Sequence, residues 1–114
     1  MDFGDDDSPQ MVRIAKVADF TPGQWRGFRI LARPVGIVLE PGGRFRAMEV
    51  GCKHENANLL EGAIRDGVVT CPWHGWRYDL RTGECVWGSK LCLRPYALEV
   101  RGEDIYISLR PVSV

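Results

Sequence analysis

The feature that most constrains this sequence is a pair of short segments that each combine one cysteine with one histidine. The first contains Cys52 and His54 in the pattern Cys-x-His, and the second contains Cys71 and His74 in the pattern Cys-x-x-His. Sixteen residues, 55–70, separate the two segments. Both histidines would stand at such offsets from a cysteine by chance in roughly one sequence in a thousand. The pattern therefore indicates a metal site with two thiolate and two imidazole ligands.

The way the ligands are paired distinguishes two kinds of metal site. Structural zinc sites with two cysteines and two histidines usually pair like with like, cysteine with cysteine and histidine with histidine. In this chain each segment supplies one thiolate and one imidazole. Mixed pairs suit a binuclear [2Fe–2S] centre, because each segment then reaches both the iron bound by cysteines and the iron bound by histidines. A zinc-binding interaction module, colourless and redox-silent, is the alternative.

Length and composition indicate one globular domain. The 114 residues can build one hydrophobic core but not two, and the 15 basic and 15 acidic side chains argue against a polybasic nucleic-acid platform. No apolar run is long enough to span a bilayer, and the acidic residues 1–7 do not resemble a signal peptide. We expect a cytoplasmic protein without nucleic-acid or membrane contacts, with a flexible leader at 1–10 and the folded domain at 11–114.

Short apolar or alternating runs separated by turn signals predict an all-β fold with little helix. The expected strands are 12–17, 27–32, 35–39, 45–50, 96–100 and 104–109. Turn-forming residues lie between them, including 33–34 and 40–43. The last two runs, joined by a turn at 101–103, predict a closing hairpin. Both histidines and all four cysteines lie between these strand-rich ends, within 51–93.

These residues together resemble the Rieske iron–sulfur family. The string Cys-x-His, sixteen residues, Cys-Pro-Trp-His-Gly-Trp is similar to its cluster motif, and residues 58–62 and 75–79 are similar to its two cluster loops. The resemblance implies an antiparallel β sandwich or barrel as a base, with a small cluster-binding subdomain inserted at about 51–93. It also implies one [2Fe–2S] cluster. Cys52 and Cys71 would bind its buried iron, and His54 and His74 would bind its outer iron.

The resemblance further implies how such a cluster is tuned, because hydrogen bonds to its sulfur atoms stabilise the reduced state. High-potential respiratory members supply a serine and a tyrosine donor and a disulfide between the two loops. Here Trp76 stands at the serine position, Tyr78 keeps the tyrosine position, and Ala57 and Trp73 occupy the two cysteine positions. We therefore predict a potential in the lower part of the Rieske range, with Trp73 and Trp76 shielding the cluster from water.

A soluble one-electron carrier of the ferredoxin type is the function that the resemblance implies. The chain has no dinucleotide-binding glycine motif, and both histidines are assigned to the cluster, so none remains for the two-histidine-one-carboxylate iron site of an oxygenase. The expected partners are a flavoprotein reductase and a terminal oxygenase or other oxidoreductase, which would dock transiently near His54 and His74. A small Rieske subunit of a nitrite reductase or oxygenase complex is the alternative.

Two cysteines and one loop lie outside the ligand motif. Cys85 and Cys92 are predicted to be reduced packing residues, although their spacing would also allow a disulfide. The loop at 86–90 has no proline, whereas the family often carries a proline-bearing loop over the cluster. This loop therefore departs from the family pattern.

Overall fold

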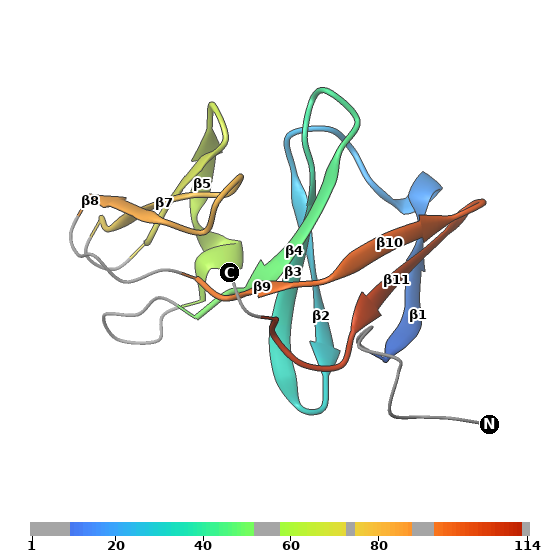
Figure 1. Cartoon of the computed structure of the whole chain (residues 1–114). Coiled ribbons are helices and arrows are strands. Elements are labelled where there is room, and N and C mark those ends of the chain that lie inside the picture. Colours follow the sequence, from blue (N-terminus) through green and yellow to red (C-terminus); the bar gives the residue numbers. More distant parts are fainter. Residues whose placement is uncertain (1–9, 52–57, 73–74, 88–92, 113–114) are drawn as a thin grey trace.

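A computed structural model of the chain describes residues 10–51, 58–72, 75–87 and 93–112 (Figure 1). Across these ranges the chain forms three antiparallel sheets. The first has the order β1-β11-β10, with bounds Met11–Lys16, Asp104–Ser108 and Leu98–Arg101. The second has the order β2-β3-β4-β9, with bounds Trp25–Ile30, Arg33–Leu39, Phe45–Glu49 and Pro95–Tyr96. The third has the order β5-β6-β7-β8, with bounds Ala63–Arg65, Val68–Thr70, Arg77–Asp79 and Cys85–Trp87.

Helical structure in the described ranges is limited to two short 3-10 turns, η1 at Val17–Asp19 and η2 at Leu59–Glu61. This agrees with the all-β prediction. No helix in these ranges is long and apolar enough to cross a membrane. The predicted closing hairpin is confirmed as β10 and β11, which pair from Leu98 with Ile107 to Arg101 with Asp104.

The second sheet lies between the other two and is covered on both faces (Figure 1). In β3, Val35 and Ile37 belong to a buried cluster that includes Ile105 of the first sheet. Val38 belongs to another cluster, which includes Val69 of the third sheet. Successive side chains of a strand alternate between faces. Burial on both faces explains why this segment of sequence is continuously apolar rather than alternating.

The hairpin between β2 and β3 differs from the sequence prediction of a strand at 27–32 and a turn at 33–34. In the structure β2 ends at Ile30, and the turn is formed by Leu31 and Ala32. Their φ angles are 51° and 66°, which is the pair of left-handed conformations that a two-residue type I′ turn requires. The prediction was wrong because it took Pro34 as a turn signal, whereas Pro34 is a residue of β3 that pairs with Arg29 of β2. The actual turn contains neither glycine nor asparagine, the residues that usually signal this turn type.

Candidate metal centre

The first of the two segments that are predicted to bear ligands begins and ends on residues that are held together. Gly51 and Asn58 form an antiparallel bridge on either side of residues 52–57. The Leu59 amide donates to the Val50 carbonyl at 2.8 Å. The chain around Cys52 and His54 therefore leaves and returns at one point, beside the end of β4.

The second segment, which connects β6 to β7, is closed in the same way. The amide of Cys71 donates to the carbonyl of Trp76 at 2.6 Å, and the amide of Gly75 donates to the carbonyl of Cys71 at 3.1 Å. Gly75 has a φ of 75°, a conformation that glycine adopts without the cost that a side chain would add. These bonds fix the chain on both sides of His74.

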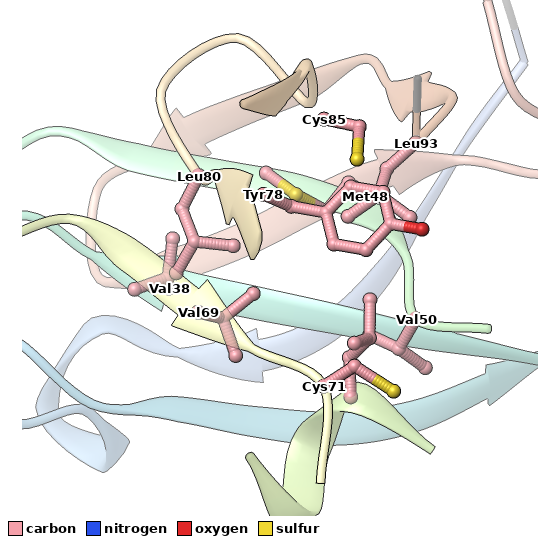
Figure 2. Close-up of a cluster of buried hydrophobic side chains, with 10 residues drawn as sticks. Val38, Met48, Val50, Val69, Cys71, Tyr78, Leu80, Cys85 and Leu93 are labelled. Carbon is pink, nitrogen blue, oxygen red and sulfur yellow. The ribbon is translucent and has the colours of Figure 1, made fainter. Parts of the chain in front are cut away.

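The ends of both segments meet in one buried hydrophobic cluster, which we call the cluster-side core (Figure 2). Val50 and Leu59 enter it from the first segment and Cys71 from the second, with exposed fractions of 1%, 0% and 2%. The other members come from the second and third sheets and the chain that follows them; they are Val38, Met48, Val69, Tyr78, Leu80, Cys85 and Leu93. The fold thus brings both flanks of the first segment and Cys71 of the second segment to the same place.

Tyr78 is the aromatic residue most completely enclosed in this core, with no exposed surface. It lies in the middle of β7, between Val69 of β6 and Cys85 of β8. In Figure 2 the phenol oxygen of Tyr78 and the sulfur of Cys71 point toward the same side of the core. Trp76 is partly buried and packs against the same core. Two of the three predicted tuning residues therefore lie beside a predicted ligand.

The remaining predicted site residues lie outside the described ranges. These are Cys52, His54, Trp73 and His74. Cys92 and most of the loop at 86–90 also lie outside them, so the alternative of a disulfide with Cys85 stays untested. Among the described residues no group of three or more histidine, cysteine, aspartate or glutamate side chains comes together as a metal site.

The surroundings of Cys71 fit an iron–sulfur ligand. A thiolate bound to a cluster needs a shell that limits water access and supplies hydrogen bonds. Cys71 is buried among aliphatic and aromatic side chains, and Tyr78 brings a hydroxyl into the same core. The donor chemistry, sulfur in an apolar pocket, is what such a cluster requires on its buried side.

Sequence reasoning missed a contact between Gly83 and Leu93, a member of the cluster-side core. Leu93, which follows residues 88–92, donates its amide to the Gly83 carbonyl at 2.6 Å. A Cβ atom on Gly83 would overlap the Leu93 carbonyl oxygen, and the φ of Gly83 is 79°. Only the fold shows what this glycine contacts, because Gly83 and Leu93 are not neighbours in the sequence.

Asp79, at the end of β7, organises the turn that leads to β8. Its Oδ1 accepts from the Arg81 amide at 2.8 Å and from the Arg81 Nε at 3.2 Å. Burial of the Asp79 carboxyl opposes ionisation, but the hydrogen bonds and positive charge of Arg81 prevail and lower its pKa below the ordinary value of 3.8. The ionised carboxylate therefore stabilises the folded state.

We predict that Asp79→Asn lowers stability by about 1 kcal/mol, or roughly 5 °C in Tm for a domain of this size. Because the pKa of Asp79 is depressed by folding, its contribution is present above pH 3.8 and is lost as pH falls through the folded pKa. Thermal unfolding of both proteins at neutral pH and at acidic pH measures this. Glu99→Gln is the control, since the pair of Glu99 with Arg101 is half-exposed and should contribute little. Equal losses in the two variants would contradict the prediction.

The three sheets and the buried surroundings of Cys71 define an all-β protein with a small cluster-binding subdomain. Comparison with known proteins gives its family. Residues 10–97 match the family model of the Rieske [2Fe-2S] domain. The chain belongs to the Rieske [2Fe–2S] family and carries one [2Fe–2S] cluster.

Relatives and solved structures place it among the ferredoxins of that family. It is 36% identical over 100 residues to the 3-phenylpropionate/cinnamic acid dioxygenase ferredoxin subunit of Shigella boydii, covering 82% of this chain and 88% of that protein. It is 28% identical to the alkene monooxygenase ferredoxin component of Xanthobacter autotrophicus, covering 93% and 87%. A solved complex of oxygenase and ferredoxin in carbazole 1,9a-dioxygenase contains a chain that matches with a TM-score of 0.81 and 26% identity, covering 91% and 97%.

These comparisons confirm the predicted fold class, cofactor and type of protein. The chain is an electron-transfer protein of the Rieske ferredoxin type, a class that serves multicomponent oxygenase systems.

Proposed function

We propose that Cys52, His54, Cys71 and His74 hold the [2Fe–2S] cluster, and that the chain passes single electrons from a flavoprotein reductase to a terminal oxygenase. The observation that carries the ligand assignment is the meeting of both segment ends in the cluster-side core, with Cys71 buried at 2% exposure. When bound, a Rieske cluster takes up and gives up one electron at a potential that its surroundings set.

Each proposed ligand has a distinct role. The thiolates of Cys52 and Cys71 hold the buried iron, and the imidazoles of His54 and His74 hold the outer iron, where a partner can approach. Two neutral imidazoles in place of two thiolates leave the oxidised centre near zero charge, compared with about −2 for an all-cysteine centre. The Tyr78 hydroxyl donates a hydrogen bond to a sulfur atom of the centre, while Trp73 and Trp76 limit the access of water to the cluster.

The domain organisation is proposed on the same basis. We assign residues 1–10 to a leader and 11–114 to one Rieske domain, since β1 begins at Met11 and pairs with β11 near the other end. The third sheet lies entirely within 51–93, which supports an inserted cluster-binding subdomain. A cytoplasmic location is proposed because thiolate ligands persist in a reducing compartment.

Docking is proposed on the surface around His54 and His74. An open hollow of about 810 Å³ supports this, because Gly75, the neighbour of His74, forms part of its wall together with Val86, Arg65 and Arg77. The wall combines apolar side chains with two arginines and one carboxylate, that of Asp66, and this excess of positive charge suits a transient partner that bears carboxylates. The complex of oxygenase and ferredoxin in carbazole 1,9a-dioxygenase is an example of such a pairing in a similar protein.

The function is tested with anaerobically purified protein. We expect two irons and two acid-labile sulfides per chain, and rapid one-electron reduction by a dioxygenase-type flavoprotein reductase followed by reoxidation by a terminal oxygenase in stopped-flow measurements. Zinc in place of iron would contradict the cluster assignment. A chain that elutes only as a stoichiometric subunit of a nitrite reductase or oxygenase and exchanges no electrons when free would favour the alternative.

Two substitutions test the tuning residues. Tyr78→Phe should lower the potential by roughly tens of millivolts, because the reduced state loses a hydrogen bond. Trp76→Ser should raise it by a similar amount if the hydroxyl reaches a cluster sulfur. Protein-film voltammetry measures both. Tyr96→Phe is the matched control, since Tyr96 is also buried but belongs to the other core cluster, and a shift equal to that of Tyr78→Phe would contradict the assigned role of Tyr78.

A further inference from the structure

Two facing glycines in the central sheet lie against Val50 and Leu60, which flank residues 52–57. Gly27 of β2 pairs directly with Gly36 of β3, and Trp25 pairs with Val38 two positions along. Side chains two residues apart in a strand share a face. Val38 belongs to the cluster-side core, so both glycines lie on the face that is turned toward that core.

Each glycine is in contact with a different flank of the segment. A Cβ atom on Gly36 would lie 2.6 Å from Cγ1 of Val50 and 2.9 Å from Cε3 of Trp25. A Cβ atom on Gly27 would overlap Cδ1 of Leu60. Neither glycine has a positive φ, so the backbone at both positions would accept another residue. At Gly36 the neighbours are the branched Val50 side chain and the rigid ring of Trp25, whereas at Gly27 the neighbour is the end of the Leu60 side chain, which must move to make room.

Val50 and Leu60 lie on either side of residues 52–57 and pack against the cluster-side core. Hydrogen bonds join both of them to the ends of that segment. The Leu59 amide donates to the Val50 carbonyl at 2.8 Å. The side-chain oxygen of Asn58 accepts from the Leu60 amide at 3.0 Å. Asn58 in turn bridges Gly51. The depth at which Val50 and Leu60 are seated therefore fixes where Gly51 and Asn58 stand above the sheet.

Packing, rather than hydrogen bonding, holds Trp25 in this arrangement. Its indole Nε1 is buried, and no described residue accepts a hydrogen bond from it. A buried donor without a partner is unfavourable, so the ring is held by its contacts with Gly36 and the cluster-side core. A methyl group on Gly36 would meet both Trp25 and Val50 and would have to displace one of them.

We propose that Gly27 and Gly36 are positioning residues that set the place of the Cys52 and His54 ligands relative to Cys71, an inference that rests on the proposed ligand assignment. A methyl group on Gly36 displaces Val50 or Trp25, and Val50 is bonded directly to Gly51 at the start of the segment. A methyl group on Gly27 displaces the Leu60 side chain from its seat on the sheet, beside Asn58 at the end of the segment. Cys71 directly follows β6 of the third sheet, so a shift of Val50 or Leu60 does not move Cys71 by the same amount. The relative placement of the two ligand pairs changes, and with it the hydrogen bonding and exposure that control the potential.

The test compares Gly27→Ala and Gly36→Ala with Gly42→Ala. Gly42 is the matched control because it has no positive φ, and a Cβ atom added to it would have no neighbouring atom within 4 Å. We expect the first two variants to shift the midpoint potential, measured by protein-film voltammetry, and the g-values of the reduced protein, measured by electron paramagnetic resonance. The control should keep both at wild-type values. Wild-type potential and g-values in Gly27→Ala and Gly36→Ala, even with a lowered Tm, would overturn the proposal, since a purely structural role predicts that pattern.

A rescue variant covers the case in which the cluster is lost. Leu60→Ala removes the atoms that a Cβ on Gly27 would meet, so Gly27→Ala/Leu60→Ala should restore the cluster and the potential of Leu60→Ala alone. Failure of this restoration would overturn the proposal. A wrong ligand assignment would appear separately, as an unchanged potential in assembled His54→Cys protein, whatever the glycine variants show.

Discussion

Replacing His74 by cysteine should lower the reduction potential of the centre by roughly 100 mV or more, provided that the cluster assembles. The physical reason is charge. A neutral imidazole is exchanged for a thiolate, so the oxidised centre becomes more negative by one unit, and adding an electron to it becomes less favourable. Rieske centres extend down to about −150 mV, whereas all-cysteine plant-type centres lie near −400 mV. His54→Cys should act in the same direction.

Voltammetry of the assembled variants measures this effect, with Thr82→Cys as a control that adds a thiol in the exposed β7–β8 turn. The control should keep the wild-type potential. An assembled His74→Cys protein with an unchanged potential would show that His74 is not a ligand. The g-values of the reduced state give a second readout, because they change with the ligands of the reducible iron.

Cys71→Ser should abolish the cluster, with iron content and the visible and electron paramagnetic resonance signals falling close to zero. A serine hydroxyl is a much poorer iron ligand than a thiolate, and Cys71 is enclosed in an apolar core that offers the hydroxyl little solvation. Burial of the hydroxyl in place of sulfur adds a desolvation cost of about 1–3 kcal/mol. Iron and sulfide analysis with thermal unfolding separates loss of the cluster from loss of the fold.

Cys85→Ser is the matched control for this experiment. Cys85 belongs to the same buried core as Cys71, with exposed fractions of 6% and 2%, so both substitutions place a hydroxyl in similar apolar surroundings. The cluster should persist in Cys85→Ser and in Cys92→Ser, since the two motif pairs supply all four ligands. Loss of the cluster in folded Cys85→Ser protein, with retention in Cys71→Ser, would show that the ligand set includes Cys85.

The burial of Cys71 and Cys85 illustrates what a sequence motif adds to a structure. Both cysteines lie in one core and share nearly the same exposure, so their surroundings alone do not distinguish a ligand from a packing residue. The Cys-x-x-His spacing does, because a ligand pair must bring a thiolate and an imidazole to one metal centre within a few residues. Motif spacing also supported the cofactor and the family, which the comparisons confirm.

Local patterns in the sequence determined the fold class. These patterns depend on neighbouring residues: the alternation at 45–50 corresponds to strand β4, and the turn signals at 40–43 and 101–103 correspond to the connections before β4 and between β10 and β11. The β2–β3 turn did not follow from such signals, because Leu31 and Ala32 adopt left-handed conformations that their residue types disfavour. Pairing along β2 and β3 imposes those conformations.

The tertiary structure alone decided how the two ligand-bearing segments are placed. Nothing near Gly27 or Gly36 in the sequence indicates that Leu60 and Val50 fill the space above them, because these contacts join segments that are distant along the chain. The same holds for the central sheet, whose two faces are buried by the first and third sheets. The sequence by itself determined the cofactor and the β architecture and supplied the proposed ligand types, since these depend on short-range spacing and alternation. Close packing between distant segments determined where the ligand loops are anchored.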